Sequence, residues 1–124
     1  MSKKILIVED EESLLKLATI LITSQGHEVI AVSSGVKALD ALAREHVDLV
    51  LLDVMLPELD GFEVCRRIKQ APETKSIPVV MLTAKKNQVD LDLGDEVGAD
   101  WYITKPFKSA NVIETVERFL NANN

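Results

Sequence analysis

The feature that most constrains the fold of this chain is a regular alternation between short apolar runs and longer amphipathic segments. Five apolar runs have the length and the flanking residues of buried strands, at residues 5–8, 29–32, 47–52, 77–83 and 101–104. After each run, apolar residues recur at helical spacing. Strict strand–helix alternation is typical of a parallel sheet that is covered on both faces. We therefore predict an α/β fold, a doubly wound sheet of five parallel strands with five helices.

Polar residues and glycines mark the expected ends of the helices. The segment Ser33-Ser34-Gly35 and the residue Asp60 stand where N-caps are expected, and Gly26 stands where a helix is expected to end. The segment around residues 89–97 keeps helical spacing but is rich in Asp and contains Gly94, so we expect this helix to be the most easily remodelled. The first two helices are expected to turn these apolar residues inward: Leu14, Leu17, Ala18, Leu21 and Ile22 in the first, and Val36, Leu39 and Leu42 in the second.

Length and composition narrow the class of protein. The chain has 124 residues, and we expect a single domain over residues 1–124 with a core that needs no disulfide. Its one cysteine, Cys65, is expected to fill space in the core and fits a reducing compartment. The sequence has neither a signal-peptide pattern nor an apolar stretch of membrane-spanning length, so we expect a cytoplasmic protein. The net charge of −6 argues against direct binding of nucleic acid.

Chemically capable side chains stand at the ends of the predicted strands. Right-handed crossovers bring the carboxyl ends of parallel strands to one edge of the sheet, where ligands of such folds bind. Five side chains are expected to meet there: Glu9, Asp10, Asp53, Thr83 and Lys105.

Three converging carboxylates repel one another, at roughly 4 kcal/mol for a pair about 4 Å apart at an effective dielectric constant near 20. A hard divalent cation such as Mg²⁺ offsets this repulsion, and Lys105 adds a further positive charge. An ionised carboxylate can attack phosphorus to form an acyl phosphate. Our hypothesis is that Asp53 is phosphorylated and that the Thr83 hydroxyl donates a hydrogen bond to the phosphoryl group.

Other classes of protein with related folds fit the residues less well. A flavodoxin needs hydrogen-bond donors for phosphate after its first strand, where this chain has acids at residues 9–12. A haloacid-dehalogenase-type phosphatase needs a second acid two residues after its nucleophile, and Met55 stands there. The chain has no Gly-rich phosphate loop ending in Gly-Lys-Ser/Thr. A non-enzymatic scaffold of the same fold stays open as an alternative.

Four segments together resemble a known family. They are residues 5–11, 52–61, 78–84 and 98–107, and they span almost the whole chain. The chain resembles the receiver domains of two-component response regulators, similar to the chemotaxis regulator CheY and to the N-terminal domains of OmpR/PhoB-type regulators. The resemblance implies a flavodoxin-like sheet with strand order 2-1-3-4-5 and a cis peptide bond before Pro106.

The resemblance also implies roles for individual residues. Asp53 would take a phosphoryl group from a phosphohistidine on a sensor histidine kinase or a histidine phosphotransfer protein. Asp10, Asp53 and the backbone carbonyl of Met55 would bind Mg²⁺ or Mn²⁺, with Glu9 acting through water. Met55 and Lys85 would tune the lifetime of the phosphorylated state. Such a protein catalyses its own phosphorylation and dephosphorylation but is not a metabolic enzyme.

A conformational switch is the remaining implication. Lys105 would contact the phosphoryl group, Thr83 would move toward it, and Tyr102 would swing inward behind Thr83. The surface of the fourth helix, fifth strand and fifth helix would then control an output protein or an appended effector domain. The resemblance implies no membrane partner and no direct nucleic-acid contact by this domain, and a monomer or a phosphorylation-dependent dimer.

Overall fold

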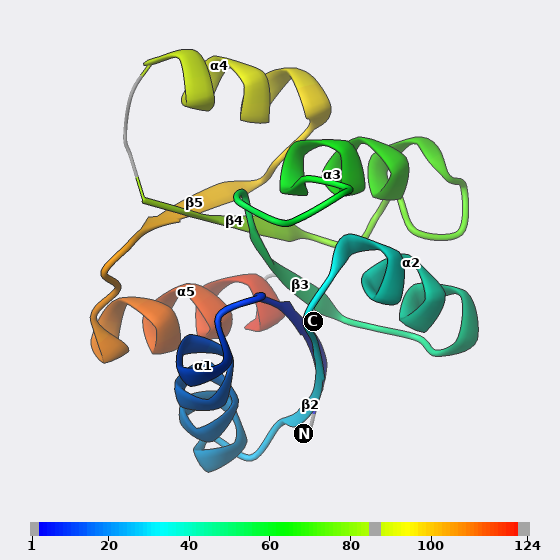
Figure 1. The fold of residues 1–124 in the computed structure, drawn as a ribbon. Coiled ribbons are helices and arrows are strands. Elements are labelled where there is room, and N and C mark those ends of the chain that lie inside the picture. Colours follow the sequence, from blue (N-terminus) through cyan, green and yellow to red (C-terminus); the bar gives the residue numbers. More distant parts are fainter. Residues whose placement is uncertain (1–2, 85–87, 122–124) are drawn as a thin grey trace.

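The computed structural model of the chain describes residues 3–84 and 88–121. Within these residues, strands and helices alternate as the sequence predicts (Figure 1). None of the described helices has the length and apolarity needed to cross a bilayer. The five strands are β1 (Lys4–Val8), β2 (Glu28–Val32), β3 (Leu49–Asp53), β4 (Val79–Thr83) and β5 (Trp101–Thr104). The five helices are α1 (Glu12–Ser24), α2 (Gly35–Arg44), α3 (Gly61–Gln70), α4 (Gln88–Val97) and α5 (Ser109–Asn121).

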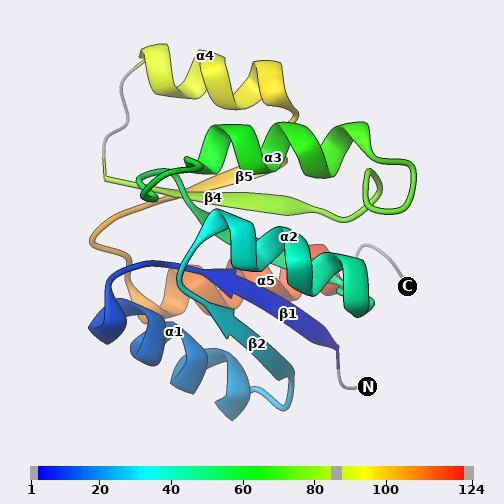
Figure 2. The ribbon, with the colours of Figure 1, turned by 45° about the vertical axis from the view of Figure 1, so that its right-hand side comes forward.

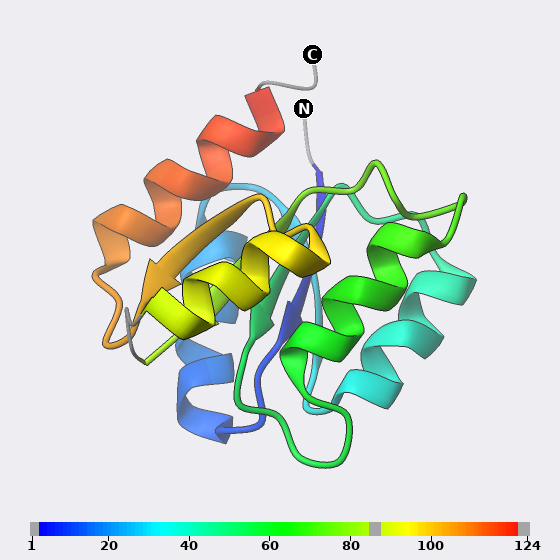
Figure 3. The ribbon, with the colours of Figure 1, turned by 90° about the horizontal axis from the view of Figure 1, so that it is seen from above.

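The strands form one parallel sheet in the order β2-β1-β3-β4-β5, which confirms the expected topology. Val8 of β1 pairs in register with Leu52 of β3, and Thr83 of β4 pairs with Thr104 of β5. Figure 3 shows the connections that follow β1 and β3 on one side of the molecule, while the amino end of β1 and the carboxyl end of α5 lie on the other. The carboxyl ends of the strands therefore share one edge of the sheet.

Helices cover both faces of the sheet (Figures 1 and 2). Ile5 and Ile7 of β1 pack in a cluster with α1 and α5, whereas Leu6 and Val8 pack on the other face with α2 and α3. Cys65 of α3 is buried in the second of these clusters, as predicted. Because both faces are covered, every residue of β3 is buried, which explains the nearly continuous apolar run in the sequence.

The helix ends follow the predicted caps. The Ser34 side chain accepts a hydrogen bond from the Lys37 N–H at the start of α2, and Asp60 does the same for the Glu63 N–H at the start of α3. Helix α1 ends just before Gly26, whose φ is 89°. The predicted fourth helix is also present, as α4, so its Asp-rich sequence does not prevent helix formation.

The predicted inner faces of α1 and α2 are wrong at two positions. Leu17 is 44% exposed and Val36 is 58% exposed. The side chains that are buried beneath these helices include the small residues Ala18 in α1 and Ala38 and Ala41 in α2. Small residues let a helix lie close to the sheet, so the larger neighbouring side chains turn toward the flanks of the helix.

Candidate functional site

Three carboxylates meet at the carboxyl edge of the sheet. Glu9 and Asp10 follow β1 directly, and Asp53 is the last residue of β3. One carboxylate oxygen of each residue lies within 4.8 Å of the other two. Glu9 and Asp53 are only 2% exposed, whereas Asp10 is exposed. We call these three residues the carboxylate cluster.

Backbone groups orient the two buried members of the cluster. The Glu11 N–H donates to Glu9 Oε2 over 3.1 Å, and the Met55 N–H donates to Asp53 Oδ1 over 3.1 Å. Both bonds join a carboxylate to the amide two residues later, a local pattern that fixes an acidic side chain at a strand end. Each carboxylate therefore keeps its second oxygen for partners from elsewhere in the chain.

The ammonium group of Lys105 contacts the second carboxylate oxygen of both Glu9 and Asp53. Its Nζ lies 2.5 Å from Glu9 Oε1 and 3.2 Å from Asp53 Oδ2. Its backbone N–H donates to the Thr83 carbonyl over 2.7 Å, which continues the β4–β5 pairing one residue beyond β5. The peptide bond between Lys105 and Pro106 is cis, as the sequence resemblance implies.

The electrostatics of the site favour additional positive charge. Burial is the largest influence on Glu9 and raises the pKa of its carboxyl; the Lys105 ammonium lowers it in part, and neighbouring Asp53 raises it again. Burial would by itself lower the pKa of Lys105, but hydrogen bonds and charge from Glu9 and Asp53 outweigh burial and raise it. Both shifts favour the protonated forms. The Lys105 ammonium carries one positive charge beside three carboxylates, so it neutralises them only in part.

The loop between β3 and α3 presses against the backbone of Asp53. A β-carbon added at Gly61 would collide with the Asp53 carbonyl group and with Val54 Cα. The Gly61 N–H donates to the Val54 carbonyl over 3.0 Å, so the start of α3 is tied to the end of β3. Glu58 in the same loop has a left-handed backbone, with φ of 63°. Gly61 was not among the site residues predicted from the sequence, because its place after the Asp60 cap does not show how closely it approaches Asp53.

The structure places the other predicted site residues in different surroundings. Thr83 ends β4 and is 3% exposed. The Met55 side chain is 73% exposed, and the Met55 backbone N–H donates a hydrogen bond to Asp53. The Tyr102 hydroxyl lies against α4, 3.1 Å from the Leu91 carbonyl oxygen, so this ring is not part of the carboxylate cluster. The predicted role of Lys85 concerns a residue outside the described part of the chain.

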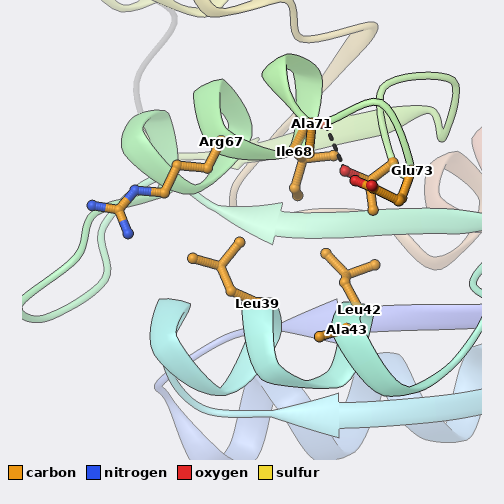
Figure 4. A pocket seen from close by; sticks show the side chains of 8 residues that line it. Leu39, Leu42, Ala43, Arg67, Ile68, Ala71 and Glu73 are labelled. Carbon is orange, nitrogen blue, oxygen red and sulfur yellow. Dashed lines mark hydrogen bonds between the residues drawn. The ribbon is translucent and has the colours of Figure 1, made fainter.

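A separate pocket lies between α2 and α3. Its volume is about 380 Å³. Figure 4 shows Leu39 and Leu42 of α2 pointing toward Ile68 of α3, with Arg67 at one end of the pocket and Glu73 at the other. The carboxylate cluster contributes nothing to its lining. The pocket therefore does not form part of the candidate site.

Comparison with known proteins identifies the family. A model of the response regulator receiver domain matches residues 5–117. The chain belongs to this family. Among curated relatives, the receiver is 46% identical over 120 residues to the alkaline phosphatase synthesis transcriptional regulatory protein PhoP of Bacillus subtilis, a match that covers 97% of this chain and 49% of that protein. The receiver thus spans about half the length of the curated relatives that it matches.

Solved structures of receivers share the fold. The chemotaxis response regulator CheY4 of Vibrio cholerae matches with a TM-score of 0.92 and 28% identity, over 97% of this chain and all of that one. The receiver domain of the sensor histidine kinase PA1611 of Pseudomonas aeruginosa matches with a TM-score of 0.90 and 30% identity, over 98% of this chain and 99% of that one. That structure has a magnesium ion coordinated in its active site cleft.

Proposed function

We propose that this receiver is a phosphoacceptor switch in which Asp53 accepts a phosphoryl group from a phosphohistidine. The donor is a sensor histidine kinase or a histidine phosphotransfer protein. The observation that carries the proposal is the position of the Asp53 carboxylate. It is buried at the end of the central strand, within 4.8 Å of two other acids, and 3.2 Å from the Lys105 ammonium.

The transfer step is a substitution at phosphorus. An oxygen of Asp53 attacks the phosphorus atom, the P–N bond of the phosphohistidine breaks with its electrons passing to the imidazole, and an acyl phosphate forms. Asp53 attacks in its ionised form, so the step needs no general base. The Lys105 ammonium is close enough to Asp53 to contact the incoming phosphoryl oxygens. The hydroxyl of Thr83, at the end of the neighbouring strand, would donate a hydrogen bond to the same phosphoryl group.

The carboxylate cluster fits a hard divalent cation. Three carboxylates with converging oxygens are the donor set that Mg²⁺ or Mn²⁺ prefers, and their charge exceeds that of the Lys105 ammonium. We infer that Asp10, Asp53 and the Met55 carbonyl hold the ion directly and that Glu9 acts through water. The bound cation supplies charge neutralisation to the transferring phosphoryl group.

The proposed output is a change in the surface formed by α4, β5 and α5. Thr83 moves toward the phosphoryl group, and Tyr102 follows it inward. A shift from about 1:99 to 99:1 requires roughly 5.5 kcal/mol of differential binding. Contacts to one phosphoryl group supply only part of this energy. We therefore infer a partial shift on phosphorylation, which is completed when the output partner binds.

The likeness to PhoP indicates what kind of output partner this receiver controls. PhoP is described as a transcriptional regulatory protein, and the receiver accounts for about half of its length. By this likeness, we infer that the receiver controls a transcriptional effector, either as a domain of the same protein or as a separate one. A cytoplasmic location follows from this role, and the receiver itself makes no contact with DNA.

Intact mass spectrometry after incubation with acetyl phosphate tests the proposal. We expect one phosphoryl adduct on the wild type that requires Mg²⁺ and is absent from Asp53→Asn. Asp40→Asn is the matched control, because Asp40 is exposed on α2 and forms an ion pair with Arg44 on the same helix. An adduct that persists in Asp53→Asn would place the chemistry elsewhere. A folded wild type that takes no phosphoryl group at saturating Mg²⁺ would instead support a non-enzymatic scaffold of this fold.

A further inference from the structure

The hydroxyl of Tyr102 is held by two acceptors from α4. It lies 3.1 Å from the Leu91 carbonyl oxygen and 2.9 Å from Asp95 Oδ1. These acceptors are one helical turn apart on α4, so they approach the hydroxyl from the same face of the helix. A hydroxyl has a single proton, and a charged carboxylate is the stronger of the two acceptors. Asp95 is therefore the main polar partner of the ring.

Gly94 makes room for this arrangement. A β-carbon at Gly94 would overlap the hydroxyl, Cε1 and Cζ of Tyr102. Glycine is a poor residue inside a helix, because it leaves the unfolded backbone more freedom than any other residue. Here it creates a notch in α4 that receives the end of the phenol ring. Shape and hydrogen bonding thus select the same orientation of Tyr102.

The environment of the ring also suppresses its ionisation. Burial is the largest influence that raises the pKa of Tyr102 above its ordinary value of 10.0, and the hydrogen bond to Asp95 and the charge of Asp95 raise it further. Asp92 and Cys65 act in the same direction more weakly. A neutral hydroxyl is thus kept as the donor toward α4.

We propose that Leu91, Gly94 and Asp95 form a latch on α4 that holds Tyr102 in its α4-facing orientation and so opposes the receiver's switch. The inference rests on the proposed function, in which Tyr102 turns inward behind Thr83. That movement must break both hydrogen bonds and empty the notch beside Gly94. Asp95 is thus a positioning residue that acts through Tyr102. Because Tyr102 belongs to β5, these contacts couple the position of α4 to that of β5.

The test uses Tyr102 as its own probe, because the chain contains one tyrosine. Replacing it with 3-fluorotyrosine gives a single ¹⁹F resonance that reports the orientation of the ring. The receiver is titrated with fluoroberyllate, a stable mimic of a phosphoryl group, at saturating Mg²⁺. For Asp95→Ala we expect the half-point of the ¹⁹F transition to fall about tenfold, the effect of losing one hydrogen bond to a charged group.

Two further variants separate the latch from general loosening of α4. Glu96→Ala removes an equal charge from an exposed neighbouring position and is expected to leave the half-point unchanged. Gly94→Ala fills the notch and also improves the helix propensity of α4. If α4 acted only through its stiffness, this variant would raise the half-point. If the notch holds Tyr102, filling it releases the ring and lowers the half-point. We expect Gly94→Ala to shift the half-point in the same direction as Asp95→Ala, with unchanged helical circular dichroism.

Failure of the latch and failure of the proposed function give different results in this titration. A wild type whose ¹⁹F signal responds normally, beside an Asp95→Ala variant with an unchanged or higher half-point, would overturn the latch alone. A wild type that binds no fluoroberyllate would overturn the proposed function and with it the latch's regulatory role. An absorbance titration of the phenol adds an independent measure, since Asp95→Asn should lower the pKa of Tyr102 toward its ordinary value.

Discussion

The ammonium of Lys105 contacts Glu9 and Asp53 together, at 2.5 Å and 3.2 Å. Glu9 follows β1 and Asp53 ends β3, so the side chain of Lys105, the residue after β5, links the carboxyl ends of these two strands. The contact places the positive charge of the site beside the proposed phosphoacceptor. It also makes the stability of the fold depend on how the carboxylates are neutralised.

Removing the Lys105 charge should destabilise the metal-free receiver. Lys105→Ala leaves two buried carboxylates without their cation, and we expect the free energy of unfolding to fall by about 3 kcal/mol. Mg²⁺ should restore more stability to this variant than to the wild type, because the ion replaces the missing charge. Urea unfolding in EDTA and in Mg²⁺ measures both effects.

Lys108→Ala is the control for this prediction, since Lys108 is an exposed lysine just beyond the same turn. It should unfold like the wild type in both buffers. Equal stabilities of Lys105→Ala and wild type in EDTA would show that the contact with Glu9 and Asp53 does not hold the site together.

The contact between Gly61 and the Asp53 backbone gives a second prediction. In Gly61→Ala the new β-carbon must displace the end of β3, at a cost of about 1–3 kcal/mol. Because the displaced backbone carries the proposed phosphoacceptor, the rate of phosphorylation by acetyl phosphate should fall about tenfold or more. Unfolding by urea and a mass-spectrometric time course measure the two effects.

Asp60→Ala is the matched variant at the start of the same helix. It removes the N-cap of α3, at about 1 kcal/mol, but leaves the Asp53 backbone untouched. Its phosphorylation rate should therefore match that of the wild type. If the two variants lose activity in proportion to their lost stability, the close approach of Gly61 has no specific effect on the site.

The sequence was sufficient for the features that depend on periodicity. Alternation of apolar runs and helical segments predicts the parallel sheet, and parallel strands necessarily bring Glu9, Asp53 and Lys105 to one edge. The strand order itself came from the family resemblance, because alternation alone is compatible with several orders. The caps predicted at Asp60 and within residues 33–35, where the cap is Ser34, are confirmed, since capping is a local interaction.

The features that the sequence did not reveal depend on tertiary contacts. Helical spacing marks Leu17 and Val36 as apolar but does not say how far each helix is rotated about its axis. Gly61 and Gly94 look like ordinary breakers in the sequence, and their roles emerge only beside the Asp53 backbone and the Tyr102 ring. In the same way, no local pattern links Tyr102 to α4.

Asp48 gives a prediction on pH at the opposite edge of the sheet. Its carboxylate accepts a hydrogen bond from the Lys4 N–H over 2.8 Å and lies 3.0 Å from His46 Nε2. Burial opposes ionisation of Asp48, but these two partners outweigh it and hold the pKa below its ordinary value of 3.8. Because the pKa of Asp48 is lower in the folded state, the ionised carboxylate stabilises the fold above pH 3.8. This stabilisation is lost as the pH falls through the folded-state pKa.

The expected outcome is a change in the acid limb of the stability curve. Asp48→Asn should be less stable than the wild type at pH 7, and the difference should shrink as the pH falls below about 4. Urea unfolding at several pH values measures this convergence. A difference that stays constant with pH would mean that the Asp48 side chain acts through packing rather than through its charge.

Trp101 and Arg118 provide the last prediction, on the surface proposed to change with phosphorylation. The Arg118 guanidinium lies over the Trp101 ring, 4.7 Å from its centroid, and joins α5 to the edge strand β5. Trp101 is 44% exposed and is the only tryptophan of the chain, so the tryptophan emission reports the surroundings of this one ring, the Arg118 contact included. Arg118→Gln should shift the emission to longer wavelength and reduce stability by about 0.5–1 kcal/mol.

The same signal tests whether the two faces of β5 move together. Trp101 contacts α5, whereas Tyr102, the next residue, points to the opposite face and contacts α4. If β5 shifts when the site is filled, fluoroberyllate with Mg²⁺ should change the wild-type emission, and the response of Arg118→Gln should differ. Arg44→Gln on α2 should respond like the wild type. A Trp101 emission that never changes while the Tyr102 resonance does would confine the switch to the α4 side of the strand.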